Sequence, residues 1–165
     1  MTIRRFRRDD LPALYRANVA SVPGVGAETE ASLAKWIDLS TCFVATDADD
    51  APLGFITLIA TGTTAYTSAN LRWLEAYSEQ VAQSLIYVDR IALLPDARGQ
   101  RLGEALYRAA FDHFSGTDLI GCEVNIRPPN PGSHRFHKRL GFHQVGERHY
   151  DGGDKAVAYY VRPLD

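Results

Sequence analysis

The chain has 165 residues, 45% of them hydrophobic and 23% charged, a composition typical of a globular protein, and we expect a single domain over residues 1–165. Its net charge of −2 gives no general attraction to nucleic acid or to a membrane surface. No apolar run approaches the ~20 residues of a membrane span or resembles a signal peptide, so we expect a cytoplasmic protein.

The first half of the chain predicts alternating strands and helices, because apolar residues recur with period two in some segments and with helical spacing in others. A helix is expected to begin after Asp9 and Asp10, which can cap it, and to end before Pro23. A long insertion precedes the third helix, and such insertions often form binding loops. The remaining strands are expected at 2–6, 42–46 and 53–59, and the remaining helices at 31–39 and 71–83.

The second half predicts a strand at 86–94, a helix at 102–114 and a strand at 119–126, which implies a parallel, right-handed crossover. A helix from Asn130 to Gly141 and two final strands, at 144–146 and 156–161, complete the chain. The fold class is therefore α/β. We expect a mixed central sheet flanked by helices, antiparallel at its N-terminal strands and parallel at the pair 86–94 and 119–126.

Two cysteines, Cys42 and Cys122, lie far apart in apolar runs and are expected to be buried and reduced. The spacings C-x-x-C and H-E-x-x-H, which bring metal ligands together, do not occur, so we expect no metal site.

A basic loop follows the strand at 86–94 and leads directly into a helix. The unpaired N–H groups and the dipole at a helix N-terminus favour a phosphate there. The patterns G-x-x-x-x-G-K-[ST] and G-x-G-x-x-G are absent, which argues against ATP and NAD. The alternative is an ordinary loop with exposed arginines. The residues of this loop are Arg98, Gly99, Gln100, Arg101, Leu102 and Gly103.

This loop resembles the acyl-CoA loop of the GNAT superfamily of N-acetyltransferases, whose pattern is [QR]-x-x-G-x-[GA]. Arg98 and Gly103 fit, and Arg101 replaces the middle glycine. The block at 130–142, which ends in F-H-K-R-L-G-F, resembles the penultimate helix of the same superfamily, and SANLRW, YVDRIAL and CEVNIRPPNPGS are similar to a bacterial branch of predicted acetyltransferases. The resemblance covers nearly the whole chain and implies the GNAT fold, in which the parallel pair splays apart.

The resemblance implies acetyl-CoA as cosubstrate and direct transfer of its acetyl group to a primary amine of a small molecule or peptide. It is compatible with a homodimer. The alternative function is a non-catalytic acyl-CoA-binding or sensor domain of the same fold. The resemblance implies that the backbone of Ile91, Ala92 and Leu93 pairs with pantetheine, that residues 98–103 hold the pyrophosphate, and that Asn130 and Ser133 touch the CoA arm.

Deprotonating an alkyl amine at pH 7 costs about 4 kcal/mol, so a carboxylate near the splay could act as general base. Strand alternation places Asp89 on the same face as Tyr87 and Ile91, and Arg90 on the other face of that strand. In the next strand, Glu123 points away from the apolar face. Asp89 is the first candidate and Glu123 the second. An ion pair of either carboxylate with a neighbouring arginine, such as Arg90 or Arg127, is an equal alternative.

His137 occupies the place where many relatives have a tyrosine that protonates the leaving thiolate, and Ser133 lies one turn earlier and could orient it. The alternative is a histidine packed beside CoA, with water as the acid. The other histidines are expected at the surface. Residues of the insertion could line the acceptor pocket together with Tyr150 and Tyr159, and Arg72 suggests an acceptor with a carboxylate or phosphate. The insertion residues in question are Asn70, Arg72, Trp73 and Tyr77.

Overall fold

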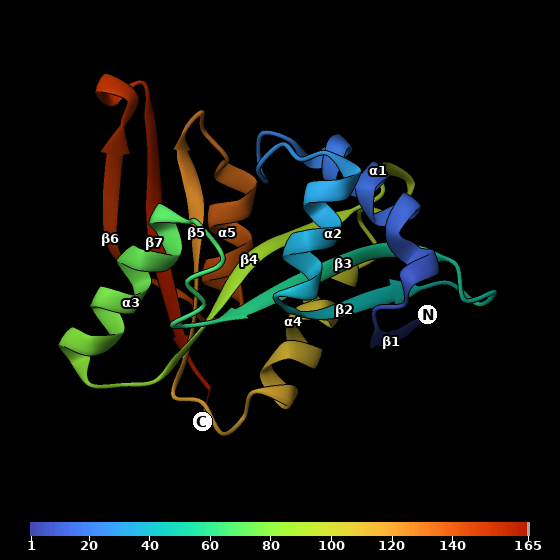
Figure 1. The fold of residues 1–165 in the computed structure, drawn as a ribbon, viewed down its shortest axis with the longest axis horizontal. Coiled ribbons are helices and arrows are strands. Elements are labelled where there is room, and N and C mark those ends of the chain that lie inside the picture. The colour runs from blue at the N-terminus through green and yellow to red at the C-terminus, as the bar shows by residue number, and fades with distance from the viewer. Residues whose placement is uncertain (165) are drawn as a thin grey trace.

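A computed structural model describes residues 1–164, which form a mixed seven-stranded sheet with helices on both faces (Figure 1). The strands are β1 (Thr2–Arg5), β2 (Thr41–Thr46), β3 (Pro52–Ala60), β4 (Leu85–Leu93), β5 (Leu119–Arg127), β6 (His143–Tyr150) and β7 (Lys155–Pro163), and the helices are α1 (Leu11–Ser21), α2 (Glu30–Asp38), α3 (Ala69–Val81), α4 (Leu102–His113) and α5 (Pro131–Arg139). The strand order is β1-β2-β3-β4-β5-β7-β6. None of the helices in residues 1–164 is both long and apolar enough to cross a membrane.

Strands β4 and β5 separate soon after they begin. They pair in parallel at three successive positions, the last being Tyr87 with Gly121, and the described residues beyond these form no further pair between the two strands. β4 nevertheless continues to Leu93 along β3, and β5 continues to Arg127 along β7. The predicted α/β class, the antiparallel first strands and the splayed parallel pair are confirmed.

Asp89 interrupts the regular alternation of β4. No residue of β3 lies opposite Asp89, although its neighbours Val88 and Arg90 are both paired with β3, so Asp89 is the extra residue of a β-bulge. A bulge shifts the side-chain alternation by one position. The predicted sharing of a face by Tyr87, Asp89 and Ile91 is therefore wrong: Tyr87 packs in the α3 core, whereas Ile91 packs against the α4 core.

Three apolar cores hold the helices to the sheet. The largest joins α4 to both halves of the sheet and includes Val88 of β4 and Cys122 and Val124 of β5. The second packs α3 against β4, β5 and β7, with Tyr87 and Tyr159 at its centre, and the third packs α1 and α2 against the strands β2 to β4. The first core confirms the apolar face that alternation predicts for β5.

Several element boundaries differ from the prediction. α3 begins and ends two residues earlier than expected, because the Ser68 side chain accepts a hydrogen bond from the Leu71 amide and Ala82 ends the helix with φ of 55°. β6 spans eight residues because it pairs with β7 as far as Tyr150 with Lys155, beyond the short apolar stretch visible in the sequence.

Candidate active site

An open groove of about 830 Å³ extends from β4 to the start of α4 and to α5. It collects most of the residues for which the sequence predicts contact with the cosubstrate. Gln100 is exposed and lies outside the groove lining, and Asn130 lines a neighbouring cavity. The candidate residues that line the groove are Ile91, Ala92, Leu93, Arg98, Gly99, Arg101, Leu102, Gly103 and Ser133.

The peptide groups of Ile91 and Leu93 point into the gap between β4 and β5. Hydrogen bonds alternate along an antiparallel pair, and the Leu94 amide donates to the Leu53 carbonyl at 2.8 Å, so the peptide groups of Ala92 are also directed at β3. Ile91 and Leu93 alternate with Ala92 and Leu94, so their peptide groups face away from β3. An extended ligand in the gap can therefore bond their N–H and C=O groups, whereas Ala92 only lines the groove.

The loop before α4 contains two residues with positive φ, Gly99 at 79° and Arg101 at 60°. Arg101 precedes the helix, and its side chain forms no hydrogen bond to the first turn, so the amides of that turn are available to an anion. The left-handed region favours glycine, which explains why the family pattern has a glycine where this chain has Arg101. A side chain at Gly103 would come within 3.3 Å of the Phe136 ring, so glycine fits there as well.

Two further cavities, of about 440 Å³ and 390 Å³, continue from the groove across the splay. The first shares Arg98 and His137 with the groove, and the second extends toward Asn70 and Tyr150. A ligand arm and an acceptor can thus enter from opposite sides and meet. The side chains that line both cavities include Asp89, Arg90, Glu123 and Asn125.

Glu123 lies at the junction of these two cavities. Its carboxyl group accepts a hydrogen bond from the Tyr87 hydroxyl, and no arginine or lysine of residues 1–164 forms an ion pair with it. Burial raises the pKa of Glu123 to about 8, and the hydrogen bond from Tyr87 only partly opposes this rise. A carboxyl group of this kind can exchange a proton near neutral pH.

Asp89 is held by two strong partners. It accepts a hydrogen bond from Arg90 Nε at 2.9 Å and from the Tyr66 hydroxyl at 2.5 Å. In a regular strand Asp89 and Arg90 point to opposite faces, but the bulge at Asp89 breaks this alternation and the two side chains form an ion pair. Of the two arginines considered as ion-pair partners, Arg90 pairs with Asp89, whereas Arg127 contacts His149.

The buried guanidinium of Arg90 also holds the segment 22–28, here called the strap, which joins α1 to α2 beside the ends of β5 and α5 (Figure 1). Arg90 Nη1 donates to the Gly26 carbonyl at 3.4 Å and to Asn18 Oδ1 at 2.9 Å. On the other side, Asn125 donates to the Pro23 carbonyl at 2.8 Å. The strap is therefore tied to both β4 and β5 where the two cavities meet.

His137 is buried and forms two specific hydrogen bonds. Its Nδ1 lies 2.8 Å from the Ser133 carbonyl, which can only accept, so Nδ1 carries the proton and Nε2 accepts from the Tyr107 hydroxyl at 2.7 Å. Burial lowers the pKa of His137 to about 4, so the ring is neutral at pH 7. Ser133 Oγ lies 3.3 Å from Nδ1, close enough to help orient the ring.

Only some of the residues predicted for the acceptor pocket line a cavity in the structure. Asn70 lines the 390 Å³ cavity with Tyr150, whereas Arg72, Trp73 and Tyr77 are absent from the lining. Arg72 bonds Glu75 and the carbonyl of Thr63 and so fixes the insertion. The Trp73 ring stacks on the Tyr159 ring with their centres 4.0 Å apart, and it lies parallel to the Tyr77 ring with centres 6.0 Å apart. These contacts pack α3 onto the sheet.

Several residues at the site have no sequence signal of their own. Tyr107 lies on the inward face of α4, and its hydroxyl reaches His137 only because α5 packs alongside. Tyr87, Arg90 and Asn125 belong to recognisable strands, but their partners come from distant segments. His134 is half-buried rather than exposed, since its Nδ1 meets the Tyr160 hydroxyl at 2.7 Å.

Relatives of the chain share this arrangement of strands and helices. The crystal structure of the ribosomal-protein-S18-alanine N-acetyltransferase from Escherichia coli covers 99% of this chain and 94% of that chain with a TM-score of 0.73 at 19% identity. A phosphinothricin acetyltransferase from Sinorhizobium meliloti in complex with AcCoA covers 99% of this chain and 88% of that chain with a TM-score of 0.72 at 22% identity. At sequence identities of 19% and 22%, this structural similarity shows only that the fold is shared.

Sequence comparison is more specific about the family. A Streptomyces griseus protein named N-acetyltransferase is 38% identical over 80 residues, which cover 48% of this chain and 38% of that protein. The matched segments span about half or less of the curated relatives' length. The model of the Acetyltransferase (GNAT) family matches residues 11–142. The chain therefore belongs to the GNAT acetyltransferase family.

Proposed function

We propose that the protein is an acetyl-CoA-dependent N-acetyltransferase that transfers the acetyl group directly to a primary amine. The observation that carries this proposal is the position of Glu123 where the cavity continuous with the groove meets the cavity that leads outward past Asn70. The groove, the loop before α4 and the free peptide groups of β4 are suited to acetyl-CoA, and the outer cavity is suited to the amine.

Glu123 is the group we assign to proton removal from the acceptor ammonium. Its pKa of about 8 brings it closer to that of an alkyl amine, which lowers the free energy cost of the proton transfer. The neutral amine then attacks the acetyl carbonyl, and a peptide N–H of β4 in the gap can donate a hydrogen bond to the oxyanion. Asp89 becomes the second candidate, because its carboxylate is already engaged by Arg90 and Tyr66.

We assign no acid role to His137 at neutral pH. A neutral imidazole whose Nε2 accepts a hydrogen bond has no proton to give at that atom. His137 instead holds the Tyr107 hydroxyl beside the 440 Å³ cavity, and the leaving thiolate takes, through water, the second proton that the amine nitrogen loses as the amide forms. Burial raises the pKa of the Cys122 thiol, which makes this residue a poor nucleophile and supports direct transfer without an acetyl-cysteine.

The test combines binding with turnover. CoA should raise the melting temperature of the protein, and Arg98→Glu with Arg101→Glu should abolish the rise, while the matched change of the exposed Arg7 and Arg8 should not. Acetyl-CoA with a panel of primary amines should release free thiol, and Glu123→Gln should suppress this release. Stabilisation by CoA without thiol release from any amine would instead support the non-catalytic acyl-CoA-binding domain.

A further inference from the structure

The outer cavity has different charges at its two ends. Glu123 of β5 lies opposite Tyr159 of β7, and Asn125 lies opposite Val157 on the same face, so Glu123, Val157 and Lys155 follow one another along this face of the sheet. Lys155 also lines the cavity, four residues from Tyr159, which corresponds to roughly 13 Å at ~3.3 Å per residue. The cavity therefore extends from an acidic inner end to a basic outer end.

The inner end offers one carboxyl group to an acceptor. Glu123 has a hydroxyl partner, Tyr87, and forms no ion pair within residues 1–164. The neighbouring Asp89 is neutralised by Arg90, which it contacts at 2.9 Å. Glu123, once ionised, can therefore match only one ammonium group at this end.

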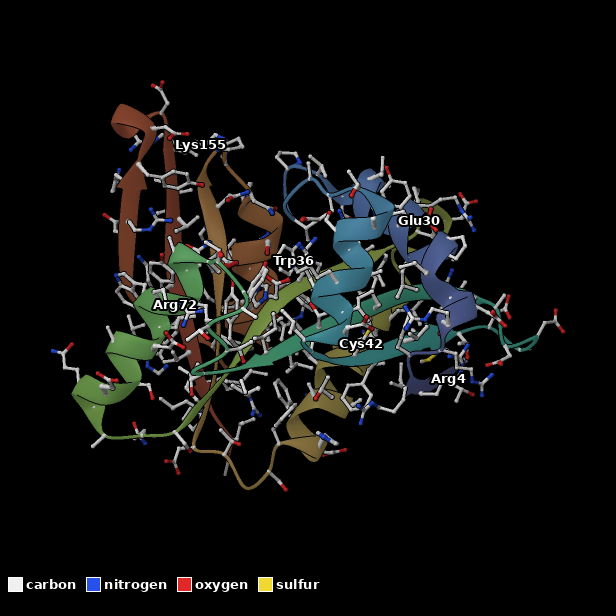
Figure 2. All side chains as sticks on the ribbon, viewed as in Figure 1. Arg4, Glu30, Trp36, Cys42, Arg72 and Lys155 are labelled. Atoms are coloured by element: carbon white, nitrogen blue, oxygen red, sulfur yellow. The ribbon has the colours of Figure 1, made fainter. Side chains whose placement is uncertain are left out.

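The outer end of the cavity carries two cationic side chains of the β6–β7 hairpin, Lys155 and Arg148. Lys155, at the turn of the β6–β7 hairpin in Figure 2, forms one ion pair with the residues in 1–164, at 3.7 Å from Asp151, and both side chains are exposed, so this pair is weak. Arg148 donates to Tyr159 Oη at 3.1 Å and to Asn70 Oδ1 at 3.2 Å, and its guanidinium lies 4.5 Å from the centre of the Tyr150 ring.

These partners of Arg148 are all uncharged, and Asn70 and Tyr150 line the cavity. The positive charge of Arg148 therefore lies behind the part of the cavity wall that Asn70 and Tyr150 form, and Arg148 pairs with Val157, two residues from Lys155 along β7. A second ammonium group would be repelled there, whereas an anionic group would be attracted by two cations.

From this arrangement we infer that the acceptor is a small molecule with a primary amine at one end and an anionic group, a carboxylate or phosphate, at the other, and that Lys155 forms the subsite for the anionic group, with Arg148 behind the cavity wall adding positive charge. This inference rests on the proposed function, because the amine end is placed at Glu123. It goes beyond that function by excluding polyamines and simple alkyl amines as preferred acceptors.

The test uses three acceptors with the same carbon chain: 6-aminohexanoate, hexylamine and 1,6-diaminohexane. They differ only in the distal group, which is anionic, neutral or cationic. We expect kcat/KM to be at least about tenfold higher for 6-aminohexanoate than for hexylamine, and lowest for the diamine. Lys155→Glu should reverse the order, while Lys35→Glu, at an exposed lysine of α2 that lines none of the three cavities, should leave it unchanged.

A binding measurement keeps the inference separate from the proposed function. With CoA present, N-acetyl-6-aminohexanoate should bind at least about tenfold more tightly than N-hexylacetamide, and Lys155→Glu should abolish the difference. Equal affinities, or a preference that survives Lys155→Glu, would overturn the inference whatever the turnover. If this preference is found but acetyl-CoA releases no thiol with any of the three amines, the anion subsite stands and the proposed catalytic function fails.

Discussion

The Tyr107 hydroxyl donates its hydrogen to His137 Nε2 across 2.7 Å, in a part of the protein where both side chains are buried. The bond fixes the state of the histidine, because the Ser133 carbonyl already requires the proton on Nδ1. A tyrosine and a histidine that satisfy each other in this way form a structural pair beside the groove.

We therefore predict that His137→Phe lowers kcat by less than about tenfold, well below the 10²- to 10⁴-fold loss expected for a general acid. Its main effect should be on stability, by about 1–3 kcal/mol, since the buried Tyr107 hydroxyl loses its acceptor. Tyr107→Phe in the same background should recover part of this loss in urea unfolding. A wild-type kcat profile with a limb near pH 6.5 that disappears in His137→Phe would contradict this assignment.

Glu123→Gln should abolish turnover and stabilise the protein. The pKa of Glu123 is raised in the folded state to about 8, so below its ordinary value of 4.5 both the folded and the unfolded states are protonated and the carboxyl group costs nothing. As the pH rises from 4.5 to 8, ionisation favours the unfolded state, and about 3 kcal/mol is lost by pH 7. Glutamine removes this loss and can still accept the hydrogen bond from Tyr87.

The measurement is urea unfolding of wild type and variant at pH 5 and pH 8, with Glu79→Gln on the exposed side of α3 as the matched control. The stability gap between Glu123→Gln and wild type should widen at pH 8, and the control should show no gap. In the wild type, kcat/KM should rise with pH up to about 8. A Glu123→Gln protein that is less stable than wild type at pH 8 would rule out a raised pKa.

Asp89 and Arg90 should prove to be more important for stability than for the chemical step. Arg90→Met leaves Asp89 without its cation and should cost about 3–5 kcal/mol, and the double variant with Asp89→Asn should recover part of this. Because Arg90 also holds Gly26, the single change should speed amide hydrogen exchange in the strap, residues 22–28. If Asp89→Asn abolishes turnover as completely as Glu123→Gln while stability is kept, Asp89 is the base.

Variants at Arg101 test whether its charge contributes to CoA binding enough to offset an unfavourable backbone conformation. Its φ of 60° favours glycine, so Arg101→Gly should leave stability unchanged or raise it by up to about 1 kcal/mol. CoA affinity should fall about three- to tenfold, because a cation beside the pyrophosphate is lost. Arg101→Asn, which tolerates the same backbone, is the control for charge alone. Calorimetry that finds equal or tighter CoA binding by both variants would show that the arginine is not used.

The groove could be predicted because its determinants are local. The residues Arg98 to Gly103 form a short loop that leads into one helix, and Asn130 and Gly141 mark the two ends of another, so short patterns describe them well. The splay could be predicted only through the family resemblance, since nothing in β4 or β5 taken alone shows where their pairing stops.

The inner site depends on contacts between distant segments, which a single sequence does not reveal. The bulge at Asp89 exists only in the register of β4 with β3, and it decides which partner this carboxylate meets. In the sequence Arg72 resembles a ligand for an anion, but it forms an ion pair with Glu75, one turn along the same helix. Arg148 lies in a polar stretch that predicts little, and only the pairing of β6 with β7 brings it against Asn70.

Within residues 1–164, the early end of pairing between β4 and β5 leaves two rows of peptide groups without a strand partner. At the outside of a sheet such rows are templates for association with other chains. Here both rows lie in the middle of the sheet, with β3 and β7 on their far sides and the strap across the opening. The protein thus keeps the free strand edges of its splay inside the sheet, which protects it from edge-to-edge aggregation with other chains.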